Sequence, residues 1–478
     1  MRPVVRFLSD EFRSGVIQAA YDLLAREGMH IDHDLLLSKL GDSGCRVDLG
    51  KKRAWINARL LDECVASAPR QVELWNIAGD RCCTLAGDAV HFTPGSTAVK
   101  LLDEGERVMR RATARDMLRY CRLVEQLPHI DYSSTALVPS DVPAQIGDSI
   151  RLYALLKLTT KPTVTGAFTV PGMHVMVDLQ LAVRGTRERL LQKPFAMFSC
   201  APTSPLKWSN AIADNAMVCA ESGIPIEIVA MPLAGLAAPV TLEGSLIQHT
   251  AEALSGVVIS QLSRVGAPVV YGGSPATMDM RTMAVCLASL EAQMIACAHA
   301  EIGKHLGLPT QAYIGLSDSK LLDGQAGFES GTGAYLAALA GINSVSGPGM
   351  LCFENCLSLE KLLFDNDICG FAKRLTRGVE ARDAFELAEV FEELIREESL
   401  LGSDHTVTNY RAEHYMPGAA MDRRAGDDVP SVGLVERALR EVDAYLSAYT
   451  PPSALNADQV YELEGIMQRA AGDYRLTF

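Results

Sequence analysis

The chain has 478 residues, of which 48% are hydrophobic and 21% are charged, and its formal net charge is −14. This composition is typical of a folded globular protein and excludes a largely disordered chain. The length is enough for one large core or for two to three ordinary ones. The acidic balance argues against a nucleic-acid-binding protein, because such a surface needs basic patches.

The cysteines and the first residues bear on where the protein works. Twelve cysteines occur without the spacing of a disulfide framework, so we expect reduced and mostly buried thiols. The N-terminal stretch MRPVVRFLSDEFRSGVIQAAYDLL lacks the apolar block of a signal peptide. Since no apolar run approaches membrane-spanning length, we expect a cytoplasmic protein that does not enter a membrane.

Residues 1–90 differ in pattern from the middle of the chain. Helical patterns occur at about 9–27, 33–41 and 57–67, and the short strand-like pieces QVELWNI and RCCTLAGDAV follow them. This order predicts a small α+β cap at the N-terminus.

From His91 onward, short apolar or β-branched runs alternate with amphipathic helical patterns. Eight such runs are expected to be strands, at 91–95, 130–137, 162–168, 194–200, 225–233, 268–274, 310–317 and 342–349. Eight β/α units over residues 91–375 predict an α/β fold of the (β/α)8 TIM-barrel type. A doubly wound open sheet would have fewer strands and a Gly-rich turn after the first, and HFTPGST is no such turn.

After about residue 375 the alternation stops. Residues 382–402 have the pattern of one long amphipathic helix, residues 405–417 that of a polar connector, and residues 433–449 and 457–471 those of further helices. We expect residues 376–478 to form a helical C-terminal extension.

The ends of the predicted strands are where a TIM barrel holds its functional residues. They are rich in Gly, Ser, Thr and Pro, whereas histidine is nearly absent, so no metal site is predicted. The stretch Ile314–Gly333 places Asp318, Gln325 and Glu329 directly after the seventh strand. Gln325 and Glu329 share a helix face because they are four apart, whereas Asp318 could equally be a turn or helix-capping residue.

Four blocks of the sequence resemble the trimethylamine methyltransferase (MttB) family, in the right order and over nearly the whole chain. They are YGGSPATMDMRT with Glu291, GLSDSKLLDGQAGFES, GINSVSGPGML with SLEKLLFDNDICG, and DHTVTNYRAEHYMP with DRRAGDD. The resemblance implies a TIM barrel that moves a methyl group from a methylated amine to the cobalt of a separate corrinoid protein. Cobalamin would then come with that partner, and the chain would hold no permanent cofactor.

One departure from the family pattern concerns the substrate. Family members that act on trimethylamine carry pyrrolysine, and this sequence has none. The chain therefore resembles the non-pyrrolysine branch, whose members demethylate quaternary amines such as glycine betaine, proline betaine or carnitine. A quaternary nitrogen leaves as a neutral amine, so the protein must supply position, exclusion of water and a wall that stabilises a cation.

Candidate site residues follow from this requirement. Glu329 and Gln325 are expected to carry the catalytic role, and Phe92, Trp208, Tyr271 and Tyr313 the aromatic wall. Trp208 and Tyr271 could instead be packing residues. A further set is expected to bind the charged or polar groups of the substrate, namely Asp279, Arg281, Ser317, Asp318 and Ser346. Asp279 and Arg281 could equally form a structural ion pair.

Two other functions stay open at this point. A barrel lyase or hydrolase would use the Asp/Glu cluster for acid–base chemistry without a corrinoid partner. A non-enzymatic protein would bind methylated amines without transferring a methyl group. The sequence is also compatible with a homo-oligomer.

Overall fold

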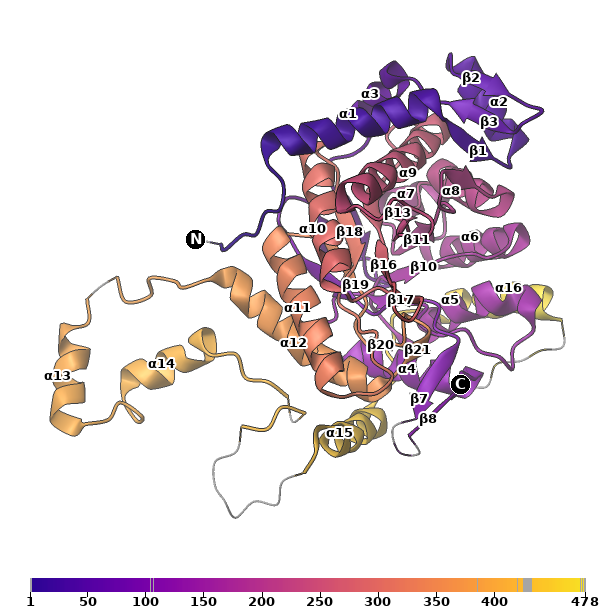
Figure 1. Ribbon diagram of the computed structural model, residues 1–478. Helices are drawn as coiled ribbons and strands as arrows, with labels where there is room; N and C mark the ends of the chain where they lie inside the picture. Colours follow the sequence, from indigo (N-terminus) through magenta and orange to yellow (C-terminus); the bar gives the residue numbers. More distant parts are fainter. Residues whose placement is uncertain are drawn as a thin grey trace.

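A computed structural model describes residues 2–103, 105, 107–384, 386–418, 420–423, 432–472, 474 and 476. Its centre is an eight-stranded parallel sheet with the strand order β6-β19-β18-β15-β13-β11-β10-β9 (Figure 1). The edge strands meet, because the Asp131 amide donates to the Phe92 carbonyl at 2.8 Å and the Phe92 amide donates to the Asp131 carboxylate at 2.8 Å. The predicted TIM-barrel-like α/β fold is confirmed.

Each barrel strand lies inside one of the runs expected from the sequence. The strands are β6 (His91–Thr93), β9 (Ser133–Ser134), β10 (Thr163–Thr165), β11 (Ala196–Cys200), β13 (Ile226–Ala230), β15 (Val269–Gly273), β18 (Thr310–Tyr313) and β19 (Ser344–Ser346).

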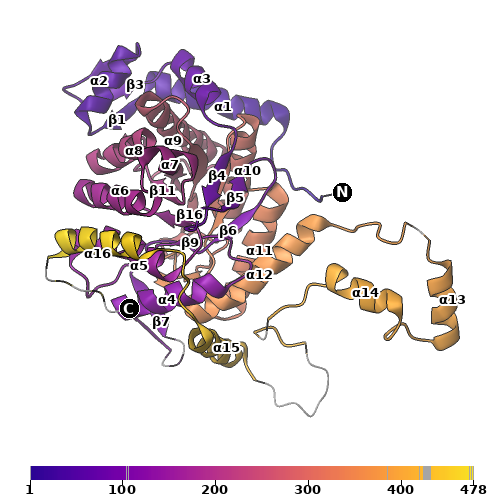
Figure 2. The same ribbon diagram turned by 180° about the vertical axis from the view of Figure 1, so that it is seen from behind.

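Helices cover the outside of this sheet (Figure 2). They are α4 (Ala114–Gln126), α5 (Gly147–Leu158), α6 (Val170–Arg184), α8 (Asn210–Ser222), α9 (Leu242–Ser263), α10 (Leu290–His305), α11 (Gly324–Ala340) and α12 (Leu359–Arg377), with the short η1 (Ala144–Ile146) and α7 (Arg187–Gln192) between them. Side-chain caps begin most of them. Thr113 and Asp116 form a reciprocal capping box at α4, which satisfies amides that the first turn leaves unpaired.

The N-terminal region packs on one side of the barrel and also closes the N-terminal end of the barrel. The helices expected there are present as α1 (Asp10–Arg26), α2 (Asp34–Asp42) and α3 (Ala58–Ser67), beside a small sheet of β1 (Met29–Ile31), β2 (Arg46–Asp48), β3 (Arg53–Trp55) and β12 (Lys207–Trp208). The hairpin of β4 (Val72–Trp75) and β5 (Arg81–Leu85) contributes Leu74, Cys83 and Leu85 to an apolar cluster with the barrel residues Tyr132 and Met197. This hairpin therefore plugs the N-terminal end of the barrel.

Two further small sheets belong to the loops that follow barrel strands. One contains β7 (Lys100–Asp103), β8 (Val108–Arg111), β20 (Met350–Leu351) and β21 (Cys356–Leu357). The other contains β14 (Leu233–Ala234), β16 (Ala276–Asp279) and β17 (Ala284–Cys286).

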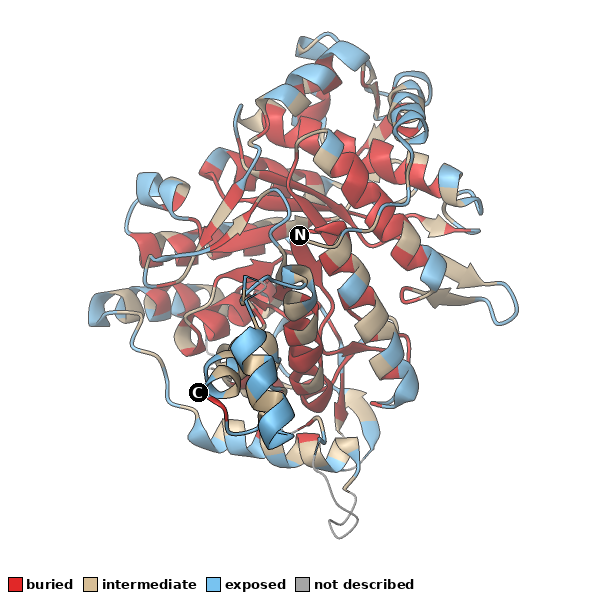
Figure 3. Cartoon of the chain, turned by 90° about the vertical axis from the view of Figure 1, so that its left-hand side faces the viewer, coloured by how far each residue is buried: buried red, intermediate tan, exposed pale blue. Residues whose placement is uncertain are grey.

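The C-terminal region differs from the expectation in its first half. Residues 382–402 hold a short helix, α13 (Ala388–Glu397), which ends at Glu398 in a left-handed conformation, and the expected connector contains α14 (Asp404–Glu413), capped by Ser403. Neither helix has a buried residue, and both stand away from the barrel (Figures 1 and 2). Buried residues concentrate in the central sheet and in the helices around it (Figure 3). By contrast, α15 (Leu434–Ala448) and α16 (Ala457–Ala471) pack on it with buried residues such as Val442 and Leu463.

Part of the DRRAGDD block, residues 424–428, lies outside the described residues. Over the part of the chain that is described, no helix combines the length and the hydropathy that crossing a bilayer requires.

Candidate active site

A pocket of about 200 Å³ opens at the C-terminal end of the barrel. We call it the barrel pocket. Strand ends contribute Gly166, Ser199, Val229, Ser274 and Tyr313 to its lining. The loops that follow contribute Ser96, Thr97, Ala167, Phe168, Ala201, Met231 and Glu354, and the first turn of α8 contributes Ile212.

The alternation of strand residues determines what lies beneath this pocket. Residues two apart on a strand face the same side of the sheet. Val229 lines the pocket, so Glu227 faces the barrel interior one step below it, and Gln311 lies in the same way below Tyr313. The barrel interior therefore has an apolar layer at the plugged end, a polar layer with Glu227 and Gln311, and the pocket above.

Glu227 is the most unusual group in this interior, because its carboxyl group is fully buried. One oxygen, Oε1, accepts a hydrogen bond from Ser199 Oγ at 2.6 Å. The other, Oε2, has no hydrogen-bond partner among the residues that the structure describes. Burial raises the pKa of Glu227 to about 7. A buried carboxyl with a free oxygen is a candidate to meet a ligand.

A second carboxyl group, that of Glu354, enters the pocket from the turn between β20 and β21. The Ser96 amide donates to Glu354 Oε1 at 3.2 Å. Burial raises the pKa of Glu354 to about 8, and the nearby Glu227 adds to the rise. The turn also holds Cys352, Phe353 and Glu354 at φ values of 52°, 58° and 64°. Such a run of left-handed residues without glycine is costly and is typical of functional sites.

Tyr313 is linked to the Glu354 turn through Ser96. Its hydroxyl lies 2.7 Å from Ser96 Oγ, and it is 6% exposed. Burial, followed by the charges of Glu354 and Glu227, raises its pKa well above the usual value. The phenol is therefore neutral, and its ring forms part of the pocket wall.

Gln311 ties the polar layer to the neighbouring strands. Its Oε1 accepts from the Gly273 amide at 3.1 Å, and its Nε2 donates to Ser346 Oγ at 3.4 Å. Ser346, one of the expected site residues, is thus linked to the polar layer through Gln311.

Three of the four aromatic residues expected in the cation wall do not line the barrel pocket. Phe92 packs in the core between the sheet and its helices, Trp208 donates its indole N–H to Ser255 Oγ at 2.9 Å, and Tyr271 donates its hydroxyl to Thr250 Oγ1 at 3.2 Å. Ser255 and Thr250 belong to α9, outside the barrel. These positions favour the packing alternative for Trp208 and Tyr271.

The residues expected after strand seven form a separate group. We call Ser317, Asp318, Gln325 and Glu329 the rim cluster. Glu329 Oε2 accepts from Ser317 Oγ at 2.6 Å and from the Asp318 amide at 2.8 Å, and its Oε1 accepts from Gln325 Nε2 at 2.9 Å. None of the four lines the barrel pocket.

Asp318 joins the rim cluster to the loop before α10. Its carboxylate accepts from the Leu287 and Ala288 amides at 3.2 and 3.0 Å. Burial nevertheless raises the pKa of Asp318 to about 6. The N-cap of α11 is Asp323, so Asp318 ties loops together and caps no helix.

Asp279 and Arg281 form an ion pair of 2.8 Å at the turn between β16 and β17. The Arg281 side chain is 88% exposed, and neither residue lines the barrel pocket. The hydrogen bonds from Arg281 lower the pKa of Asp279 to about 2. This geometry corresponds to the structural alternative for the pair.

The sequence-based expectation missed Glu227, Glu354, Ser199, Ser96 and Gln311 as site residues. Glu227 had a detectable signal, since it is a glutamate inside the apolar strand IEIVA. A charged residue in a buried strand is rare unless it has a role. Glu354 and Ser96 lie in loops. Because loops have no hydrophobic periodicity, the sequence does not predict which loop residues line a pocket.

Comparison with known proteins agrees with this architecture. The family model for trimethylamine methyltransferase (MTTB) matches residues 1–473. A trimethylamine methyltransferase MttB of Desulfitobacterium hafniense is 28% identical over 93% of this chain and 90% of that protein. A glycine betaine methyltransferase of the same species is 26% identical over 94% of both. The MttB of Methanosarcina thermophila is 30% identical over 78% of both.

Among solved structures, the monomethylamine methyltransferase MtmB of Methanosarcina barkeri superposes with a TM-score of 0.56, covering 97% of this chain and 87% of that one. At 10% identity this likeness shows the fold alone. From the family match over nearly its whole length, the chain belongs to the trimethylamine methyltransferase (MttB) family and is a methyltransferase.

Proposed function

We propose that the protein transfers a methyl group from a quaternary amine, glycine betaine or a similar compound, to Co(I) of a cognate corrinoid protein. The observation that carries the proposal is the fully buried Glu227 beneath the barrel pocket, whose Oε2 has no hydrogen-bond partner among the described residues. The partner's corrinoid supplies a nucleophilic cobalt that accepts the methyl group.

The pocket suits a ligand that carries a positive charge without an N–H. Such a cation is stabilised by aromatic faces and by carboxylates placed nearby, because it has no proton to donate. The barrel pocket is lined by Tyr313 and Glu354, and Glu227 lies one step beneath it, where it accepts a hydrogen bond from the lining residue Ser199. A bound cation would favour the ionised form of both acids and lower their pKa values from about 7 and about 8.

The charge of the ligand changes during the reaction. The N–C bond breaks, the electron pair stays on nitrogen, and the amine leaves as a neutral molecule. The buried carboxylates then lose their counter-charge, so each favours taking up a proton again. We expect this change to weaken product binding, because the carboxylates attract the cationic substrate but not the neutral amine.

The mouth of the pocket suits a large partner. Phe168 and Met231 line the pocket and are 52% and 42% exposed. Leu236, Met280 and Met283, on the β14–β16–β17 sheet and its turns, are also exposed. Exposed apolar residues around a pocket mouth are typical of a docking surface, here for the corrinoid protein.

The choice of a quaternary amine rests on the absence of pyrrolysine from the sequence more than on similarity to named relatives. The relatives include proteins named for trimethylamine and for glycine betaine, at comparable identity. This chain contains no pyrrolysine, which favours a substrate that already has a good leaving group.

The proposal is tested by incubating the protein with Co(I) cobalamin and, in turn, with glycine betaine, proline betaine, carnitine and trimethylamine. We expect at least one quaternary amine to cause enzyme-dependent loss of the Co(I) absorbance, and trimethylamine to cause none. If trimethylamine were the best donor, the quaternary-amine proposal would be wrong. If no amine in the panel caused loss of the Co(I) absorbance, this result would contradict methyl transfer from this substrate class.

A further inference from the structure

Two adjacent cysteines occupy the hairpin that plugs the barrel. Cys82 and Cys83 belong to β5, and Cys83 pairs with Leu74 of β4. Cys82 is exposed, whereas Cys83 is 2% exposed and packs in the apolar cluster with Tyr132. Their sulfur atoms lie 3.6 Å apart, with the Cys83 thiol donating to Cys82 Sγ. Neighbouring strand residues normally face opposite sides, so this approach of the two thiols is unusual.

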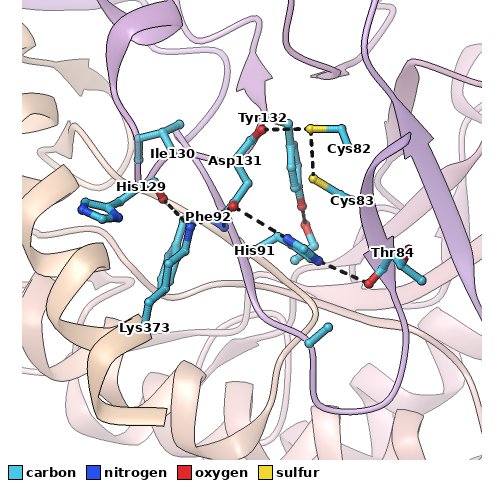
Figure 4. A network of polar contacts seen from close by, with 12 residues as sticks. Cys82, Cys83, Thr84, His91, Phe92, His129, Ile130, Asp131, Tyr132 and Lys373 are labelled. Atoms are coloured by element: carbon cyan, nitrogen blue, oxygen red, sulfur yellow. Dashed lines mark hydrogen bonds and ion pairs between the residues drawn. The ribbon is translucent and has the colours of Figure 1, made fainter. Parts of the chain in front are cut away.

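A charged network surrounds the pair (Figure 4). Cys82 Sγ lies 3.7 Å from the Asp131 carbonyl oxygen. The Asp131 carboxylate lies 3.8 Å from His91 Nδ1 and 2.8 Å from Lys373 Nζ. The hydrogen bond from Cys83 lowers the pKa of Cys82 to about 7 against the opposing effects of burial and of the Asp131 charge, and the charges of His91 and Lys161 add to the lowering. The same contact raises the pKa of Cys83.

Other cysteines of the chain have the opposite environment. Burial raises the pKa of Cys45, Cys64, Cys121, Cys200 and Cys219, and likewise of Cys286, Cys297 and Cys369. Thiol reactivity requires exposure together with a neighbourhood that stabilises the thiolate. Cys82 combines the two and has a second thiol within contact distance.

We propose that Cys82 and Cys83 form a thiol–disulfide exchange site that reacts with a low-molecular-weight disulfide of the glutathione type. The Cys82 thiolate attacks one sulfur of the disulfide, which breaks the S–S bond, forms a mixed disulfide on Cys82 and releases one thiolate. The Cys83 thiol then gives up its proton and attacks Cys82 Sγ. A Cys82–Cys83 disulfide forms, and the second thiolate leaves. The two cysteines lose two electrons and two protons, and the small disulfide becomes two thiols.

The product is expected to form reversibly. Adjacent Cα atoms are about 3.8 Å apart, which is shorter than the usual span of about 4.4–6.8 Å between disulfide-linked residues. Strained disulfides are reduced more readily than unstrained ones. Closing the bond also moves Cys83 toward Cys82, so we expect looser packing of the plug against Tyr132.

The sequence allows a direct test, because trypsin cleaves after Arg81 and Lys100. The peptide 82–100 contains Cys82 and Cys83 and no other cysteine. The full-length protein is incubated with oxidised glutathione, its free thiols are blocked, and the unreduced digest is analysed by mass spectrometry. We expect this peptide to become two hydrogen atoms lighter, and to do so before peptides that contain Cys286 or Cys352 are modified.

Three variants separate the steps. Cys83→Ser should stop at the mixed disulfide, so that peptide 82–100 carries one glutathione. Cys82→Ser should leave the peptide unmodified, and Cys352→Ser, which removes a partly exposed thiol elsewhere, should change nothing. Modification of Cys286 or Cys352 ahead of peptide 82–100, or an unmodified Cys82 in the Cys83→Ser variant, would overturn the proposal.

A kinetic readout applies even if the disulfide proves too short-lived to isolate. At pH 7 the alkylation of Cys82 by iodoacetamide should be about fivefold faster in the wild type than in Cys83→Ala, because the variant lacks the stabilising hydrogen bond. Equal rates in the two proteins would show that Cys83 does not activate Cys82.

Discussion

Two polar clusters lie toward the C-terminal end of the barrel, and they differ in what their carboxylates contact. In the rim cluster, both oxygens of Glu329 accept hydrogen bonds from within the cluster. Beneath the barrel pocket, Glu227 has one oxygen bound to Ser199 and the other without a partner among the described residues. Buried polar groups with complete hydrogen bonding stabilise a fold, whereas a free one requires an explanation. From this difference we propose a structural role for the rim cluster and ligand binding at the pocket.

The largest effect is expected from Glu227→Gln. Glutamine can keep the hydrogen bond from Ser199 Oγ but offers no negative charge to a cation. We expect kcat/KM for methyl transfer to fall at least about 100-fold, which corresponds to ~2.7 kcal/mol. The measurement is the rate of Co(I) loss with the best amine of the panel. A decrease in kcat/KM of less than about threefold would show that the cation does not bind next to Glu227.

At alkaline pH, Glu227→Gln should be more stable toward unfolding than the wild type. The carboxyl of Glu227 has a pKa of about 7 in the folded protein and an ordinary value of about 4.5 when unfolded. The neutral form therefore stabilises the fold fully below the unfolded pKa, and this contribution is lost as the pH rises through 7.

Relative to Glu227→Gln, wild-type stability should decrease by up to about 3 kcal/mol between pH 4.5 and 8. Urea unfolding of both proteins at several pH values measures this. A difference in stability that does not change with pH would show that Glu227 ionises normally.

A smaller effect is expected at Tyr313. Tyr313→Phe keeps the ring and loses the hydroxyl contact with Ser96, so the Kd for the amine should rise about two- to fivefold. Tyr313→Leu removes the ring, and the Kd should rise about 10- to 30-fold, since a cation–π contact is worth ~1–2 kcal/mol. Calorimetric titration of both variants measures the two contributions. Equal Kd values for Phe and Leu would exclude a role for the ring.

The smallest effect on function is expected in the rim cluster. Glu329→Gln weakens charge-assisted hydrogen bonds to Ser317 and the Asp318 amide, so unfolding should become easier by about 1–2 kcal/mol. The Kd for the amine should stay within about threefold of the wild type. A loss of binding as large as that of Glu227→Gln would reverse the assignment of the two clusters.

The fold was predictable because its signals are periodic. All eight barrel strands lie inside predicted runs, and the Thr113–Asp116 capping box is present. The site was harder to predict. The polar residues after strand seven were conspicuous in the sequence. Their side chains form hydrogen bonds with one another, however, and only the three-dimensional structure reveals those bonds. Glu227 gave a detectable but weak signal, because a single glutamate inside an apolar strand hardly changes the hydropathy of that strand.

The aromatic residues illustrate the same limit. Phe92 and Tyr271 lie on barrel strands, as expected, but a one-residue difference in position decides whether a side chain faces the barrel interior or the helices. Tyr313 lies on the inner side of β18 and lines the pocket, whereas Tyr271 contacts α9. Strand boundaries read from sequence are too uncertain to make this distinction.

Proton release on ligand binding shows whether the bound cation interacts with Glu227. The amine that gives the fastest Co(I) loss is titrated at pH 7 into the wild type, Glu227→Gln and Glu329→Gln, in buffers of different ionisation enthalpy. We expect a bound cation to ionise Glu227, so that the wild type and Glu329→Gln release about half a proton or more per ligand and Glu227→Gln releases clearly less. Equal proton release by all three proteins, or none from the wild type, would contradict this expectation.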